Sequence, residues 1–189
     1  HLLVDKCQIP SDSGGRGHLP PFEDEIRAAQ LKSAGVPPHF IKKMGTGPWR
    51  PMPTENPWVL LYGPTGCGKT HLAVEMIVGR AGARFVAWND VVEQRRRHIM
   101  ATRTFEDPLE HIKNLRGILV VDDLGAEFVT DVSKEAADLL ISARYNNEAP
   151  TILTSNLTLK QLASVYGDRL GSRIAGSARI IELAEKSDR

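Results

Sequence analysis

The stretch GPTGCGKT, residues 63–70, has the composition and spacing of a loop that binds phosphate groups. It matches the pattern GxxxxGK(S/T), follows an apolar run directly and opens a helical stretch, as this pattern requires. Its glycines allow successive backbone N–H groups to face one anion, and the helix N-terminus adds partial positive charge. An ordinary glycine turn would not need Lys69 and Thr70 in register, so we predict a nucleotide-binding loop. The expected nucleotide contacts are Gly63, Pro64, Thr65, Gly66, Cys67, Gly68, Lys69, Thr70 and His71.

Two aspartates supply the second half of the predicted site. Asp122 ends the apolar run GILVVDDLG (117–125), at the carboxyl end of an expected strand, where open α/β sheets bind ligands. We expect Lys69 to reach the β- and γ-phosphates, and Thr70 to bind Mg²⁺. Asp122 would hold Mg²⁺ through a water, and Asp123 would polarise the attacking water of a hydrolysis reaction. The alternative is a strand end with two solvated aspartates.

A third polar strand end belongs to the run ILTSN (152–156). Asn156 would lie beside the same phosphates and help to orient the water. This assignment is less specific, because strand ends are often polar. Cys67 lies inside the loop, where we expect it to fill space, since ATP hydrolysis needs no thiol nucleophile.

Two basic stretches complete the chemistry-bearing residues. Arg169 and Arg173 lie four residues apart in GDRLGSRI (167–174), so a helix would place them on one face. The stretch QRRRHIMATR (94–103) contains four arginines and no acidic residue. For both stretches a solvated helix face is the simplest interpretation. The acidic residues expected to pair with some arginines of the second stretch are Glu93, Glu106 and Asp107.

These residues need a scaffold that brings distant strand ends together. From residue 57 onward, apolar runs of strand length alternate with helical stretches, which predicts right-handed parallel crossovers and strands buried on both faces. We therefore predict a three-layer α/β/α fold around a mostly parallel five-stranded sheet. Predicted helix starts are Asn89, Asp107 with Pro108, and the capping box of Thr158 and Gln161. The predicted strands are 57–62, 83–88, 117–123, 150–156 and 178–183.

Composition limits the class of protein. The 189 residues suffice for one domain with a core, and a net charge of +1 gives no global attraction to nucleic acid or membrane. No apolar run is long enough to span a bilayer, and no signal peptide pattern begins the chain. Cys7 and Cys67 have no spacing of a disulfide framework or zinc ribbon, so a cytoplasmic location is the default expectation.

The N-terminal part differs from the rest. Residues 1–20 are rich in Gly, Ser and Pro, residues 22–34 are expected to be helical, and residues 36–56 to be irregular. We expect two units, a flexible arm with a short helix (1–34) and an ATPase domain (35–189). The first unit could be the remnant of a partner-binding region, because a start at His1 suggests a fragment or a processed chain. Cys7 and His18 make at most half of a metal site.

Together these stretches resemble the AAA+ ATPases, and within them the DnaC/IstB group of helicase loaders and transposition helpers. The resemblance runs from about Ala34 to the C-terminus. Its carriers are AGVPPHF, LLYGPTGCGKTHLA, ILVVDDLG, ARYNNEAPTILTSNL, YGDRLGSRI and the closing KSDR. The resemblance implies a P-loop NTPase of AAA+ type without a C-terminal helical lid. By position, it also places adenine near Val36, Pro37 and Phe40.

The resemblance gives the arginines of the predicted helix at 167–174 a role. In this family the helix before the final strand faces the nucleotide of a neighbouring subunit, so a homo-oligomer with nucleotide at subunit interfaces is implied. Arg173 is the first choice for the arginine finger that completes the neighbour's site, and Arg169 is the second. Such fingers raise rates by roughly 10³–10⁵ in GTPases.

The resemblance also implies partners. Helices near the second basic stretch contact single-stranded DNA in loaders and initiators, so phosphate contacts are implied for Arg95, Arg96, Arg97 and Arg103. The implied function is an ATP-dependent replication factor that loads a replicative helicase onto single-stranded DNA, with ATP and Mg²⁺ as cofactors. The terminal GDRLGSRI is more similar to replicative loaders than to transposition helpers.

Three alternatives stay open. The first, within the same fold, is an IstB-like ATP-dependent transposition helper that wraps DNA and recruits a transposase. The second is a P-loop kinase of small molecules, against which the two aspartates and the missing lid argue. The third is an adaptor that binds ATP only to hold a shape, and intact Lys69, Thr70, Asp122 and Asp123 argue against it.

Overall fold

A single parallel sheet organises the computed structural model, which describes residues 5–6, 21–43, 57–101 and 107–184. The strand order is β1-β6-β2-β5-β4-β3, and every strand pair in the described ranges is parallel. This order places the ends of β2, β5 and β4 side by side. The strands are β1 (Asp5–Lys6), β2 (Trp58–Tyr62), β3 (Arg84–Ala87), β4 (Leu119–Asp122), β5 (Thr151–Ser155) and β6 (Ala178–Glu182).

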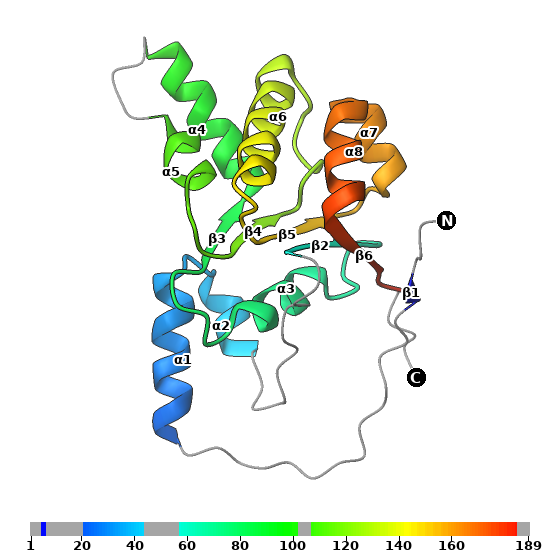
Figure 1. Ribbon diagram of the computed structural model, residues 1–189. Helices are drawn as coiled ribbons and strands as arrows, with labels where there is room; N and C mark the ends of the chain where they lie inside the picture. The colour runs from blue at the N-terminus through cyan, green and yellow to red at the C-terminus, as the bar shows by residue number, and fades with distance from the viewer. Residues whose placement is uncertain (1–4, 7–20, 44–56, 102–106, 185–189) are drawn as a thin grey trace.

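The five predicted strands are all present, and the predicted three-layer α/β/α architecture is confirmed (Figure 1). The sixth strand, β1, pairs with β6 through Asp5 and Lys6 alone. Two residues are too few to produce a periodic pattern, so this strand could not be predicted. The predicted flexible arm therefore contributes a strand to the sheet edge. Most of that arm lies outside the described residues, as do Cys7 and His18.

Helices cover both faces of the sheet (Figure 1). Helices α1, α2 and α3 lie on one face, and α4 to α8 lie on the other. The alternation of side chains along β2 explains this: Val59 and Leu61 pack with α3, whereas Trp58 and Leu60 pack with the opposite helices. The helices are α1 (Pro21–Ser33), α2 (Pro38–Lys43), α3 (Lys69–Ile77), α4 (Trp88–Met100), α5 (Pro108–Lys113), α6 (Asp131–Asn146), α7 (Leu159–Tyr166) and α8 (Asp168–Ser177).

Two local predictions were wrong. The segment 36–56, expected to be irregular, contains α2, whose first residue Pro38 has its φ preset for a helix. Asn89 does not cap a helix, because α4 already begins at Trp88 with Ala87 at the N-cap. A helix start without a capping side chain leaves no sequence signal.

Other helix starts follow the prediction. The Asp107 side chain accepts a hydrogen bond from the Leu109 N–H at 3.0 Å and caps α5. Thr158 and Gln161 form the expected capping box of α7. The caps set where these helices begin and therefore which residues face the core.

Two further expectations concern the described residues only in part. No helix in the described ranges is both long enough and apolar enough to cross a bilayer. After β6 the structure describes only residues 183 and 184, neither of them helical. The expected absence of a helical lid stays a prediction.

Arg144, on α6, is a fully buried cation that joins α5 and α6 to the segments that lead into β4 and β5. Its Nε donates to Thr151 Oγ1 at 3.0 Å, and its terminal nitrogens donate to backbone carbonyl groups. Burial lowers the pKa of Arg144 to about 10. Its carbonyl partners are Leu115 at 2.6 Å, Gly117 at 3.0 Å, Pro150 at 2.6 Å and Ile112 at 3.5 Å.

The substitution Arg144→Met should lower the free energy of unfolding by about 3 kcal/mol or more, because one Thr151 hydroxyl and four buried or partly buried carbonyl groups lose this donor together. Urea denaturation measures this. Arg97→Met is the matched control: that arginine is exposed, with only an i,i+4 pair to Glu93, worth about 0.3–0.5 kcal/mol. Equal losses in the two variants would contradict the structural role of Arg144.

Candidate nucleotide-binding site

The loop between β2 and α3 has the shape of an anion cradle. Gly66 and Gly68 have φ of 84° and 97°, a conformation that favours glycine. A Cβ placed at either residue would meet no atom within 4 Å, so open space lies above the backbone there. Pro64 and Thr65 are exposed, and Gly63 is buried. A phosphate group therefore fits this loop and the N-terminus of α3 that follows it.

The Lys69 side chain is buried, with 5% of its surface exposed, and it points back into the loop. Its Nζ donates to the carbonyl oxygens of Gly63 at 2.9 Å and Pro64 at 2.8 Å, and to Asn156 Oδ1 at 2.8 Å. This contact places Asn156 at the phosphate loop, and its expected role in orienting a water stays a prediction. The ammonium group has no carboxylate among these partners, so it can turn to an anionic ligand.

Asp122 lies at the end of β4 and accepts two hydroxyl hydrogen bonds on one oxygen. Thr70 Oγ1 donates to Asp122 Oδ1 at 2.8 Å, and Thr154 Oγ1 donates to the same atom at 2.7 Å. Burial raises the pKa of Asp122, and the two hydroxyl groups oppose that rise. A hydroxyl and a carboxylate side by side are the oxygen ligands that Mg²⁺ prefers, so the residues fit this ion.

Asp123 follows in a conformation that is uncommon for a residue with a side chain. Its φ is 57°, and its N–H donates to Thr154 Oγ1 at 2.8 Å. Its side chain is exposed. Backbone strain of this kind persists where the surroundings fix it, and it is concentrated at functional sites. The Asp123 charge also acts on its neighbour, because it contributes to the raised pKa of Asp122.

The other predicted nucleotide contacts include buried apolar side chains and one polar pair on α3. Cys67 is 3% exposed and packs in the apolar cluster between the sheet and α3, which confirms its space-filling role. His71 Nε2 lies 3.2 Å from Glu75 Oε1 along α3. Val36 is buried in the same cluster, with Phe40 packed against it. The adenine contact of these two residues stays a prediction.

The α8 arginines face α6 and share one carboxylate. Arg173 Nη1 donates to Asp138 Oδ1 at 3.3 Å and to the Ser142 hydroxyl, and its guanidinium lies 5.8 Å from the Tyr145 ring centroid. Arg169 Nη1 lies 3.9 Å from Asp138 Oδ2. The Arg173 side chain is 16% exposed and that of Arg169 is 70% exposed. The predicted common face is present.

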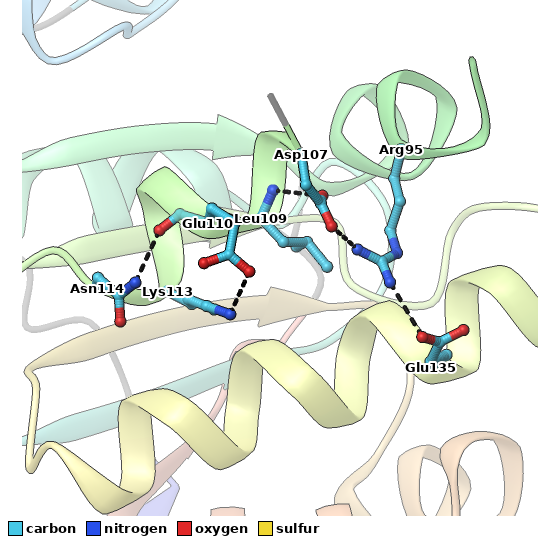
Figure 2. A network of polar contacts seen from close by, with 7 residues as sticks. All are labelled: Arg95, Asp107, Leu109, Glu110, Lys113, Asn114 and Glu135. Carbon is cyan, nitrogen blue, oxygen red and sulfur yellow. Dashed lines mark hydrogen bonds and ion pairs between the residues drawn. The ribbon is translucent and has the colours of Figure 1, made fainter. Parts of the chain in front are cut away.

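Figure 2 shows why the basic stretch on α4 is not uniform. Arg95 is 7% exposed and lies between α4, α5 and α6. It forms an ion pair with Asp107, and its Nη2 donates to Glu135 Oε1 at 3.0 Å. The structure thus removes Arg95 from the surface that DNA would contact, because its charge holds three helices together.

Two of the four predicted DNA contacts are exposed. Arg96 and Arg97 lie on the outer face of α4, and Arg97 Nε donates to Glu93 Oε1 at 3.0 Å. Pairing of some arginines with nearby acids is therefore confirmed. Arg103 lies outside the described residues, as does Glu106.

Sequence reasoning missed several residues around the site. Thr154 had a sequence signal, because it begins the polar end of the run ILTSN, and the register of β5 with β4 places it beside Asp122. Asp138, on α6, and Glu127, on the loop before it, gave no signal. Their partners are distant in sequence, and only the packing of α7 and α8 brings them together.

The substitution Asp122→Asn should raise the Tm at pH 7. A folded-state pKa above the ordinary value means that the charged form opposes folding; the stability of the protonated form is lost as pH rises through that pKa. An asparagine Oδ1 can still accept both hydroxyl hydrogen bonds. The gain should shrink as the pH falls toward about 4, the ordinary pKa of aspartate.

Thermal unfolding at both pH values measures this gain, with Asp90→Asn as the control on an exposed carboxylate of α4. A lower Tm for Asp122→Asn at pH 7 would show that the carboxylate stabilises the fold instead.

The fold is similar to those of two solved structures, DnaC and DnaI. A crystal structure of the DnaC helicase loader matches with a TM-score of 0.57 and 31% identity, covering 68% of this chain and 81% of that chain. The crystal structure of DnaI matches with a TM-score of 0.56 and 25% identity, covering 85% of each chain. The domain is a P-loop NTPase of the AAA+ type.

Curated relatives come from mobile elements. A protein named for ATP binding in insertion sequence IS232 of Bacillus thuringiensis subsp. berliner is 26% identical over 140 residues, covering 69% of this chain and 55% of the relative. Its counterpart in IS5376 of Geobacillus stearothermophilus is 31% identical over 114 residues, covering 58% and 44%. The chain thus spans about half the length of these relatives.

A family comparison covers most of the chain. Residues 30–187 match the profile of the IstB-like ATP-binding proteins. The matched range includes the anion cradle, the ends of β4 and β5, and the α8 arginines. The chain therefore belongs to the family of IstB-like ATP-binding proteins, in the DnaC/IstB group of AAA+ proteins.

Proposed function

We propose that this chain hydrolyses ATP at a site shared between subunits and uses the ATP cycle to act on single-stranded DNA. One observation carries the ATPase proposal. The loop residues Lys69 and Thr70 contact the polar ends of two neighbouring strands, at Asn156 and Asp122. A domain that used ATP only to hold its shape would not need Asp123 exposed beside them.

The residues divide the reaction between them. The backbone of the cradle and Lys69 would bind the phosphates of ATP, and Thr70 and Asp122 would hold Mg²⁺. When bound, Mg²⁺ neutralises charge on the β- and γ-phosphate oxygens. Asp123 orients the attacking water, with Asn156 beside it. The water oxygen bonds to the γ-phosphorus as one of its protons passes to a γ-phosphate oxygen, and the bond from that phosphorus to the bridging oxygen breaks, which releases ADP and phosphate.

The neighbouring subunit supplies the remaining cation in this proposal. Arg173 is the finger and Arg169 the second candidate, as the family resemblance implies. Both arginines contact Asp138 on α6, away from the Lys69 and Asp122 contacts of their own chain. An arginine in trans would have to leave Asp138 to reach a nucleotide. An isolated subunit is then a poor ATPase.

The first measurement is steady-state ATP hydrolysis against protein concentration, with and without single-stranded DNA. The rate per subunit should rise with concentration, and Arg173→Ala should lower it by about 10²-fold or more while ATP binding survives. Arg80→Ala is the control, because Arg80 is exposed and lies on the loop that follows α3. A flat rate that is indifferent to DNA and to Arg173→Ala would instead favour the small-molecule kinase.

Two protein partners fit the ATPase proposal. The structural likeness to a helicase loader supports delivery of a replicative helicase. The family profile and the insertion-sequence relatives support recruitment of a transposase equally well. Gel filtration with ATP separates the two, because a stable complex with the replicative helicase supports the first and a complex with a transposase supports the second.

DNA binding should depend on the exposed arginines of α4. Arg96→Gln should weaken binding of single-stranded DNA and reduce its salt dependence by about 0.7 in the log–log slope, as for one lost phosphate contact. Arg95→Gln should mainly lower the Tm, because that side chain is buried in ion pairs. Fluorescence anisotropy at several salt concentrations measures the slope. If Arg96→Gln binds as wild type does, the α4 surface is not the DNA contact.

A further inference from the structure

Glu127 is a buried carboxylate that the proposed reaction does not use. It lies four residues after Asp123, on the loop between β4 and α6, and is 7% exposed. Trp88 Nε1 donates to its Oε1 at 2.9 Å, and the Gly125 N–H donates to its Oε2 at 3.0 Å. The Tyr166 hydroxyl also donates to Oε1. All three donors are neutral groups.

These three hydrogen-bond donors come from three separate segments of the chain. Gly125 belongs to the turn that begins at Asp123. Trp88 is the first residue of α4. Tyr166 is the last residue of α7, separated by Gly167 alone from the helix that carries the arginines. Burial and the neighbouring carboxylate raise the pKa of Tyr166, so its phenol stays a donor.

An apolar side chain could fill this position at lower cost. Burial of a carboxylate costs free energy that hydrogen bonds must offset, and apolar replacements of buried polar groups are often neutral or stabilising. What a carboxylate adds is direction: its two oxygens fix the donors relative to one another. The strained Asp123 conformation needs such a fixed neighbour, because strain persists only where the surroundings determine it.

We propose that Glu127 is a positioning residue for both halves of the shared ATPase site. Through Gly125 it fixes the loop that places Asp123 in its own subunit. Through Tyr166 it fixes the start of α8, whose arginine serves the next subunit. This inference rests on the proposed function, in which Asp123 acts in cis and an α8 arginine acts in trans.

Mixed subunits can separate the two halves. An acceptor subunit carries Arg173→Ala, and a donor subunit carries Asp123→Asn. Each is inactive alone, and an equal mixture should recover hydrolysis where a donor arginine meets an acceptor site. Glu127→Gln is then added to the acceptor subunit alone or to the donor subunit alone. Tyr166→Phe is tested in the same two ways. Glu110→Gln, on the exposed surface of α5, is the control.

Glu127→Gln should lower the recovered rate by roughly tenfold or more in either partner, because small misplacements of reacting groups are costly. Tyr166→Phe should lower it to that extent only in the donor, with a much smaller loss in the acceptor. ATP affinity, measured with a non-hydrolysable analogue, should change little. A merely structural role would make Tyr166→Phe act equally in both partners, and each loss of rate would follow a loss of Tm.

The failures are distinguishable. If the mixture without further substitutions recovers no activity, the proposal of a shared site is wrong. The role of Glu127 in the subunit that supplies the arginine is then wrong as well. If the mixture recovers but Tyr166→Phe acts equally in both partners or in neither, the positioning role is overturned and the shared site stands. Should Glu127→Gln fail to fold, the more conservative Tyr166→Phe still decides the donor half.

Discussion

One oxygen of Asp122 accepts hydrogen bonds from two hydroxyl groups, and this contact joins α3, β4 and β5. It requires that parallel strands end at the same edge in a fixed register, so that Thr154 lies beside Asp122. It also requires that α3 begin where Thr70 faces the strand ends. The depth of the site, the turn at Asp123 and the reach of Lys69 all follow from this arrangement.

The charged side chains of the site have hydrogen-bond partners within the site itself. Lys69 is held by two carbonyl oxygens and an amide oxygen, and Asp122 by two hydroxyl groups. A buried ammonium or carboxylate without such partners would be costly. The same partners are weak compared with a polyphosphate and its cation, so they can be exchanged without leaving a charge unpaired. The same hydrogen bonds therefore stabilise the buried charges and can be exchanged for contacts with a ligand.

The sequence predicted the features that local patterns determine. Apolar runs gave the five long strands, and glycines with Lys69 gave the loop. Arg95 was also within reach, since it follows Val91 by four residues and Val92 by three, on the buried face of α4. The partners of Glu127 were not, because Trp88 and Tyr166 each lie 39 residues from it. Contacts of that kind depend on how helices pack, which periodicity does not encode.

The two α8 arginines share Asp138, one on each of its oxygens. A single carboxylate cannot stabilise both cations independently, so removal of one arginine frees its oxygen and strengthens the hold on the other. The two positions are therefore energetically coupled, and the effects of replacing them will not add. A defect caused by loss of Arg169 includes a change in how firmly Arg173 is restrained. Only a double-mutant cycle assigns either arginine its own share.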